Sequence, residues 1–302
     1  MMPIIDAHHH IWRQADLPWL QGPMVARIFG PYEPIRRDYP IAEYLADIKS
    51  SNVVGSVYVQ TNWAKDRAVE EATWVQSVAE SEGWPHAIVG YADLLDDNAP
   101  QTLKALAEIP RVRGIRMQLH WHENPLYRFA ATSDVMNATQ FRKNFAHVAG
   151  HDFTFDLQVF TGQMKDAANL AREFPDVTFV LQHAGMLEDK SKEGKDLWKE
   201  GMKQLADQPN IVSKLSGLGT FIQRNDSTHI TDVVHETVAI FGSDRCLYGS
   251  NFPIEKLWAS YAELVAAYRA AVSAYRPIEQ LSMLHDNVIR VYGLDSIERV
   301  NA

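Results

Sequence analysis

The sequence predicts an α/β fold, specifically a single (β/α)8 TIM barrel with extra loops after strands 1 and 4. Short apolar runs alternate with segments of helical apolar spacing along the whole chain, which is typical of parallel strands joined by helices. The apolar runs number eight, the strand count of a closed barrel. No G-x-G-x-x-G phosphate loop follows the first run. An open, doubly wound sheet shares the alternation, so the strand count and the missing glycine loop favour the barrel.

The expected strands have nearly continuous apolar interiors, which is typical of strands that helices cover. They span residues 3–8, 53–60, 86–94, 112–119, 153–160, 177–185, 210–217 and 245–251. Helical spacing of apolar residues recurs between them, for example at residues 41–51, 68–83 and 165–174.

Two connecting segments are longer than most loops in compact domains. Residues 11–40 follow the first expected strand, and residues 120–136 follow the fourth. Long loops of this kind usually carry function. No linker, low-complexity stretch or composition shift divides the chain, so we expect residues 1–302 to form one domain.

Composition excludes several classes of partner. The chain has 29 Lys and Arg residues against 38 Asp and Glu, a formal net charge of −9, whereas nucleic-acid binding needs clustered positive charge. No apolar stretch approaches the roughly 20 residues of a membrane span, and the N-terminus lacks a signal-peptide pattern. The single cysteine, Cys246, excludes an internal disulfide. We therefore expect a cytoplasmic protein without nucleic-acid or membrane contacts, with a homodimer as the common default assembly.

Polar side chains gather where the expected strands end. Chemistry in α/β barrels is built at the carboxyl ends of the strands. Buried polar atoms are costly without partners, so their repetition at one end of several apolar strands predicts a site there. The strand-end residues are His8, His10, Gln60, Arg116, Gln118, His120, His122, Gln158, His183, Lys214 and Asn251.

Three of these histidines are candidate metal ligands. His8 and His10 are two residues apart in extended backbone, so their side chains project to the same side. His183 follows another expected strand and precedes two small residues that leave room for a ligand. Neutral imidazole nitrogens are zinc ligands. The alternatives are a solvated HHH turn or tag remnant and a structural His183; the sequence alone leaves open whether a divalent metal is bound, with zinc the preferred ion.

The remaining strand-end residues favour a small anionic substrate. Arg116 and Arg128 are suited to bidentate contact with a carboxylate, although Arg128 could instead form a surface ion pair with Glu123 or Asp134. Lys214 interrupts an apolar strand, so it is either a catalytic or anion-binding group or it extends to the rim. The six expected substrate contacts are Arg116, Gln118, His120, Arg128, Gln158 and Lys214.

Taken together, these motifs resemble the amidohydrolase superfamily, in particular metal-dependent TIM-barrel hydrolases of the amidohydrolase-2 type. The resemblance runs from IDAHHHIW through VRGIRMQLHW, FPDVTFVLQHAG, NIVSKLSGL and RCLYGSNFP to LHDNVIRVYGL. It is greatest to the branch that contains sugar lactonases and pyrone-dicarboxylate lactonases. The resemblance implies that His8 and His10 are the histidine pair of the first strand, that His183 is the histidine of the sixth, and that Asn251 occupies the catalytic position of the eighth.

Asn251 departs from the family pattern. The family generally has GSDWP at this point, where the aspartate activates water, but this chain has GSNFP. An asparagine side chain cannot take that proton near neutral pH. The remaining candidates for the base are Glu255, His183 and a metal-bound hydroxide, because a bound divalent ion lowers the pKa of water to about 7. Glu255 could equally be a first-turn helix carboxylate.

The sequence thus predicts a hydrolase that opens a small carboxylated or sugar-derived lactone. His8, His10, His183, Asn251 and Glu255 are the expected catalytic residues. One alternative is a metal-dependent nonoxidative decarboxylase of an aromatic acid, which the resemblance ties to an acidic residue at position 251. The other is a noncatalytic small-molecule binding protein derived from the same fold.

Overall fold

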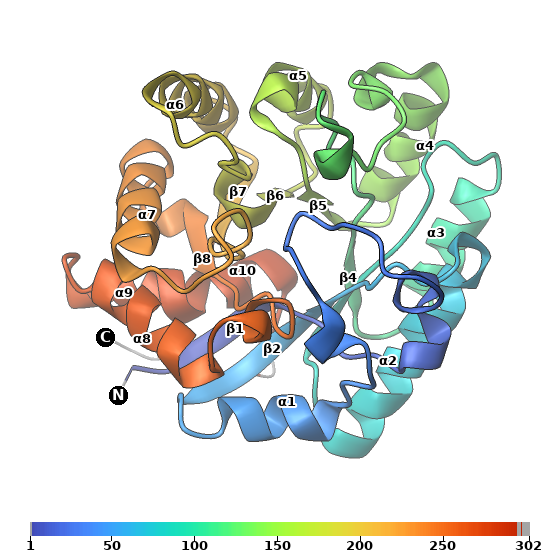
Figure 1. The fold of residues 1–302 in the computed structure, drawn as a ribbon. Helices are drawn as coiled ribbons and strands as arrows, with labels where there is room; N and C mark the ends of the chain where they lie inside the picture. Colours follow the sequence, from blue (N-terminus) through green and yellow to red (C-terminus); the bar gives the residue numbers. More distant parts are fainter. Residues whose placement is uncertain (1, 295–296, 298–302) are drawn as a thin grey trace.

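The computed structural model describes residues 2–294 and residue 297. Eight parallel strands pair in sequence order, with helices packed around their outer side (Figure 1). The strands are β1 (Ile4–His9), β2 (Val53–Val59), β3 (Ala87–Gly90), β4 (Val112–Ile115), β5 (Thr154–Leu157), β6 (Phe179–Leu181), β7 (Ile211–Leu215) and β8 (Cys246–Tyr248). Backbone hydrogen bonds from Asn251 N to His8 O and from His10 N to Phe252 O, both 2.7 Å long, join the two ends of the sheet. The predicted (β/α)8 barrel is confirmed.

The helices α1 to α8 alternate with the strands and form the outer layer, and α9 and α10 follow α8. They are α1 (Ile41–Ile48), α2 (Ala68–Glu82), α3 (Ala99–Ala107), α4 (Thr139–Gly150), α5 (Met164–Glu173), α6 (Lys192–Ala206), α7 (Ser227–Phe241), α8 (Tyr261–Val272), α9 (Pro277–Leu281) and α10 (Asn287–Tyr292). Within the described ranges, none of the helices combines the length and apolar character needed to cross a membrane.

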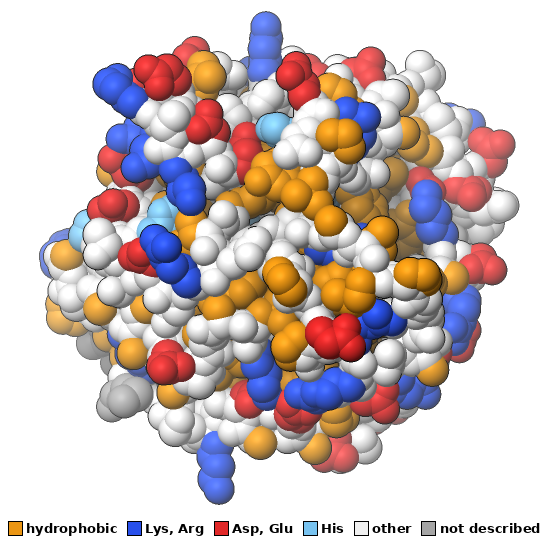
Figure 2. Space-filling view, viewed as in Figure 1, with side chains coloured by type: hydrophobic (Ala, Val, Ile, Leu, Met, Phe, Trp, Pro, Cys, Tyr) orange, Lys and Arg blue, Asp and Glu red, His pale blue; other side chains and the backbone are white. Residues whose placement is uncertain are grey.

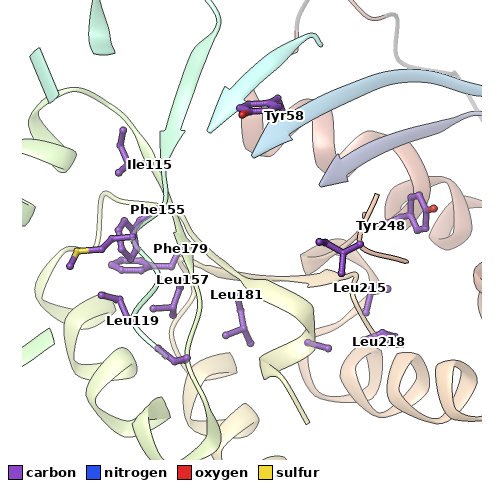
Figure 3. Packing of buried hydrophobic residues seen from close by; sticks show 14 of the residues in the cluster. Tyr58, Ile115, Leu119, Phe155, Leu157, Phe179, Leu181, Leu215, Leu218 and Tyr248 are labelled. Carbon is purple, nitrogen blue, oxygen red and sulfur yellow. The ribbon is translucent and has the colours of Figure 1, made fainter. Parts of the chain in front are cut away.

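The apolar core has two layers. Outward-facing strand residues such as Phe155 and Phe179 belong to this apolar core (Figure 3). They pack against the helices: the ring centroid of Phe145 of α4 lies 4.9 Å from that of Phe155 and 5.4 Å from that of Phe179. Inward-facing residues are smaller, and α10 contributes to their layer. That inner layer comprises Ile5, Ala7, Val57, Val59, Ala87, Val89, Val180, Val212, Leu247, Val288, Ile289, Tyr292 and Leu294.

Seven of the eight strands end earlier than the sequence predicts, whereas β1 ends one residue later, at His9. The difference matters most after β6. The expected strand at 177–185 stops at Leu181, and residues Gln182–Gly185 form a 3₁₀ turn. His183 and Ala184 have φ angles of +53° and +47°. Residues with left-handed backbone angles cannot continue the hydrogen-bond pattern of a strand, so the apolar segment extends beyond the end of β6. This turn places His183 just beyond the carboxyl end of β6.

The two long segments lie at the carboxyl end of the barrel. The segment 11–40 contains three 3₁₀ turns, and an antiparallel bridge between Trp12 and Tyr39 holds its ends together. In Figure 1 this segment passes in front of the barrel opening. The segment 120–136 contains one complete 3₁₀ turn, Pro125–Tyr127, and the start of another. Both segments contribute walls to the cavities described below.

Candidate active site

Three histidine side chains meet at the carboxyl end of the barrel. His8 lies in β1, His10 follows this strand, and His183 lies in the turn after β6. The ring centroid of His8 is 5.0 Å from that of His10 and 4.8 Å from that of His183. His8 and His10 are buried. The alternative of a solvated turn or tag remnant is therefore wrong, and the structure brings the predicted histidine cluster together.

Hydrogen bonds orient two of these rings. His10 Nδ1 lies 2.7 Å from Val59 O, and since a carbonyl only accepts, Nδ1 carries the proton of the neutral ring. His183 Nδ1 lies 2.9 Å from Ser216 Oγ. Burial, followed by the positive charge of Arg116, lowers the pKa of His10 to about 3. The same two causes lower the pKa of His183 well below its ordinary value, so both imidazoles are neutral near pH 7.

Arg116 presents a charged donor beside the histidines. It follows β4 and is buried at the wall of the site. Its Nη2 donates to Gln60 O at 2.6 Å, whereas its Nε has no hydrogen-bond partner among the described residues. Burial lowers the pKa of Arg116 to about 10, which leaves the guanidinium charged near neutral pH. The free Nε–H can therefore bind a carboxylate or carbonyl oxygen.

Lys214 lies inside the barrel rather than at its rim. Its Nζ is 2.6 Å from Asp156 Oδ2, and neither side chain is exposed. Tyr292 of α10 donates to Asp156 Oδ1 at 2.9 Å, and Gln182 donates to Oδ2 at 2.9 Å. Extension of Lys214 to the rim is thus contradicted. Its ammonium does not line the pocket, but its charge contributes, after burial, to lowering the pKa of His8.

A pocket of about 100 Å³ opens over this cluster. Figure 2 shows the hollow at the mouth, with apolar side chains around it. Its polar lining includes His10, Gln60, Arg116, Gln118, Gln158, His183 and Asn251. Gln118 Oε1, Gln158 Oε1 and Gln60 Nε2 are buried without a hydrogen-bond partner in the part of the chain described. Such atoms are ready to bind a polar ligand.

Asn251 connects the pocket to Glu255. The Asn251 side chain interacts with both His10 and Glu255, and its φ of +58° is one that asparagine tolerates. Glu255 is only 1% exposed and begins the 3₁₀ turn Glu255–Leu257. Burial raises the pKa of Glu255 to about 8, although Trp258 Nε1 donates to its Oε2 at 2.9 Å. The carboxyl of Glu255 is therefore mostly protonated near pH 7. It does not line the pocket, but it interacts with Asn251, which does.

His120 and Arg128 lie farther out. Both line a second cavity adjoining the pocket, which we call the outer chamber. Arg128 Nε donates to His122 O at 3.0 Å and Nη2 donates to Glu123 O at 2.9 Å, while the guanidinium lies 5.0 Å from the Trp121 ring centroid. The carboxylates of Glu123 and Asp134 form no ion pair with it in the described structure. The surface ion pair considered for Arg128 is therefore not formed.

The donor chemistry of the cluster fits a zinc ion in part. Both ring nitrogens of His8 are buried without a partner among the described residues. The Nδ1 hydrogen bonds of His10 and His183 resemble the outer contacts that orient zinc-binding histidines. Across residues 2–294 and 297, however, no group of three or more His, Cys, Asp or Glu side chains is already arranged to hold a metal ion.

Comparison with known proteins places this architecture in a family. The model of the family described as amidohydrolase matches residues 5–294. The chain belongs to the amidohydrolase family. The uncharacterized protein y4mH of Sinorhizobium fredii is 34% identical to this amidohydrolase over 96% of this chain and 98% of its own length. An L-fucono-1,5-lactonase of Burkholderia multivorans is 29% identical and covers 96% of each chain.

A solved amidohydrolase structure from Burkholderia multivorans with bound zinc superposes with a TM-score of 0.80. It is 24% identical to this chain and covers 96% of it and 99% of its own length. At this identity the likeness concerns the fold. A protein of the same fold thus binds zinc.

Sequence reasoning missed the apolar walls of the pocket and the partner of Lys214. Trp12, Phe29 and Phe221 line the pocket, but they come from loops whose paths no local pattern reveals. Asp156 lies within the apolar run FTFDLQVF. A carboxylate in one buried strand and a lysine in another is a pairing signal that could have indicated this ion pair.

Proposed function

We propose that this amidohydrolase hydrolyses a small lactone that carries a carboxylate or sugar hydroxyls. The observation that carries the proposal is the convergence of neutral His10 and His183 with the unpaired Arg116 Nε on one pocket. Imidazole supplies a proton acceptor, and guanidinium supplies a donor for an oxygen that gains negative charge. The lactonase relative from Burkholderia multivorans, at 29% identity, supports the same reaction class.

In the proposed reaction, water attacks the lactone carbonyl carbon. The carbonyl oxygen accepts from Arg116 Nε, which stabilises the charge of the tetrahedral intermediate. His183 takes a proton from the attacking water and returns it to the ring oxygen as the ring C–O bond breaks. The product is an open hydroxy acid. No proton acceptor is required at Asn251, because an imidazole at the same pocket performs that step.

Amide side chains orient the ring in this proposal. Gln118 and Gln158 present unpartnered Oε1 atoms that can accept from ring hydroxyls. Asn251 interacts with His10 and would help to position its ring. Glu255 supports Asn251 from behind rather than meeting the substrate, because it does not line the pocket.

Zinc is the cofactor that we propose for the histidine donors, which fit it in part. Because His183 accepts a proton in the proposed reaction, His8 and His10 would hold the ion, and a bound zinc ion would polarise carbonyl oxygens and lower the pKa of coordinated water. Elemental analysis of protein purified without chelators measures its presence directly.

The decisive experiment compares lactone opening with ligand binding. A pH-indicator assay over sugar lactones and carboxylated lactones is expected to show opening above the spontaneous rate. His183→Asn should lower kcat by roughly 10² or more, the usual contribution of general acid–base catalysis. His147→Asn, at an exposed position on α4, is the matched control and should retain activity. Lactone binding without opening by the wild-type protein would instead support the noncatalytic alternative.

A further inference from the structure

The outer chamber is larger than the pocket that contains the histidines. It has a volume of about 520 Å³, compared with about 100 Å³ for the inner pocket. Ile28, Phe29, Asn62 and Gln118 line both cavities, so the two adjoin. The inner pocket has room for little beyond a small ring. A substituent on that ring would extend past these shared residues into the chamber.

The chamber combines aromatic walls with positive charge. Trp19, Trp63 and Phe129 line it, and Phe129, which is 48% exposed, belongs to the segment 120–136. Arg27, Lys65 and Arg128 also line it, and no Asp or Glu is among its lining residues. Aromatic rings bind flat apolar groups, and guanidinium groups bind anions.

Arg27 is the cation with the fewest contacts. Lys65 is compensated, since its Nζ lies 2.6 Å from Asp93 Oδ2. Arg128 is held by two backbone carbonyls. The Arg27 guanidinium lies 5.7 Å from the Trp19 ring centroid, but it forms no ion pair in the described structure, and its buried Nε has no hydrogen-bond partner there. An unpaired guanidinium nitrogen removed from water is costly unless a ligand satisfies it.

We propose that the outer chamber binds an aromatic extension of the substrate that ends in an anionic group, with Arg27 as its anion contact. The assignment of the ring to the inner pocket rests on the proposed lactonase function. The assignment of an anionic aromatic group to the chamber rests only on the residues and charges that line the chamber. The preferred substrate class is accordingly a lactone with an arylcarboxylate-like substituent rather than an unsubstituted sugar lactone.

Binding measurements on ring analogues that cannot be hydrolysed test this proposal without requiring turnover. The probes are two cyclic ethers of the lactone ring size, one with a benzyl substituent and one with a carboxybenzyl substituent. Calorimetry on the full chain should show the carboxybenzyl probe binding at least about tenfold more tightly, as expected for a charged hydrogen bond. Arg27→Met and Arg27→Gln should each remove most of this preference.

Lys65→Met is the matched control within the same chamber. Because Asp93 already compensates Lys65, this variant should keep most of the carboxylate preference. Equal binding of the two probes to the wild-type protein would overturn the proposal, as would a preference that survives both Arg27 substitutions. Loss of the preference in Lys65→Met to the same extent would also contradict the assignment to Arg27. If the predicted binding pattern holds while no lactone is opened, the chamber stands and the lactonase function fails.

Discussion

Arg116 is the residue on which the proposed recognition of an anionic substrate depends most directly. Its guanidinium is held by one hydrogen bond, from Nη2 to Gln60 O, and directs an unpartnered Nε toward the histidine pocket. A buried charged donor of this kind discriminates between a substrate that supplies a negative partner and one that does not.

Arg116→Met should lower kcat/KM for a neutral and a carboxylated lactone, because both lose the donor to the carbonyl oxygen. The loss should be greater for the carboxylated lactone, because its negative charge also loses the nearby guanidinium. We expect the ratio of the two kcat/KM values to fall by roughly 10- to 100-fold, which corresponds to about 1.5 to 3 kcal/mol for a charged hydrogen bond. Steady-state kinetics on a matched pair of lactones measures this ratio. Equal losses for both substrates would refute carboxylate recognition by Arg116.

Asn251→Asp adds a titrating group next to His10 without changing side-chain shape. The fold should tolerate it, because aspartate also accepts the positive φ at this position. We expect kcat to acquire a new pH dependence, since a carboxylate beside the imidazole alters proton transfer. A kcat profile identical to that of the wild-type enzyme would show that the residue at position 251 does not influence the reacting centre.

At the scale of the strands, the ion pair between β5 and β7 determines how charge is held inside the barrel. Lys214 and Asp156 are completely buried, and Tyr292 and Gln182 also donate hydrogen bonds to the carboxylate. A buried pair of this kind is costly to break, because removing one partner leaves the other charge uncompensated.

Lys214→Met should therefore lower the free energy of unfolding by about 3 to 5 kcal/mol. The double variant Lys214→Met/Asp156→Asn should recover a substantial part of this loss, because no unpaired charge remains. Urea unfolding of the single and double variants provides the measurement. If the double variant is as destabilised as the sum of the two single variants, the charge pairing is not what stabilises this layer.

The turn after β8 carries a pH-sensitive group, the carboxyl of Glu255. Burial raises the pKa of Glu255 from its ordinary value of 4.5 to about 8. A raised folded-state pKa contributes stability that is fully present below pH 4.5 and is lost as pH rises through about 8. Glu255→Gln removes this titration while retaining an acceptor for Trp258 Nε1.

We therefore expect the wild-type free energy of unfolding to fall between about pH 5 and pH 8 more steeply than that of Glu255→Gln. Denaturant unfolding at several pH values within this range compares the two slopes. Parallel curves would mean that Glu255 does not retain its proton in the folded protein.

The sequence predicted the positions of the elements more accurately than their ends. The expected strands at 53–60 and 112–119 begin where β2 and β4 begin. The expected strand at 177–185 extends too far, because its apolar residues continue into a left-handed turn after Leu181. Hydrophobic periodicity reports burial, whereas the end of a ladder depends on backbone angles that VLQHAG does not reveal.

Within the candidate site, polar residues close to strand ends were predictable, but residues on long loops were not. His10, His183, Arg116 and Asn251 line the pocket as their strand-end positions suggested. Trp12, from the segment 11–40, reaches the same pocket through tertiary packing. No periodic pattern carries that information, since the paths of such loops depend on contacts distant in the sequence.

At the scale of the whole molecule, the residues that stabilise the barrel and the residues of the candidate site lie at different levels along the barrel axis. Small apolar residues and α10 fill one end, the Lys214–Asp156 pair lies inside, and the histidines and Arg116 face the opposite end. The chain has a formal net charge of −9, yet the lining of the outer chamber contains cations and no acidic residue. The proposed binding of an anionic group in this chamber is consistent with that lining, because nearby positive charge attracts anions.

Lactone opening in ¹⁸O-labelled water tests the proposed hydrolysis. We expect the wild-type enzyme to produce a hydroxy acid whose new carboxylate carries one oxygen from water, at a rate well above spontaneous opening. His183→Asn should lose this acceleration, while His147→Asn retains it. An absence of acceleration by the wild-type enzyme across carboxylated, aryl-substituted and sugar lactones, or an undiminished rate in His183→Asn, would contradict lactone hydrolysis by the histidine cluster.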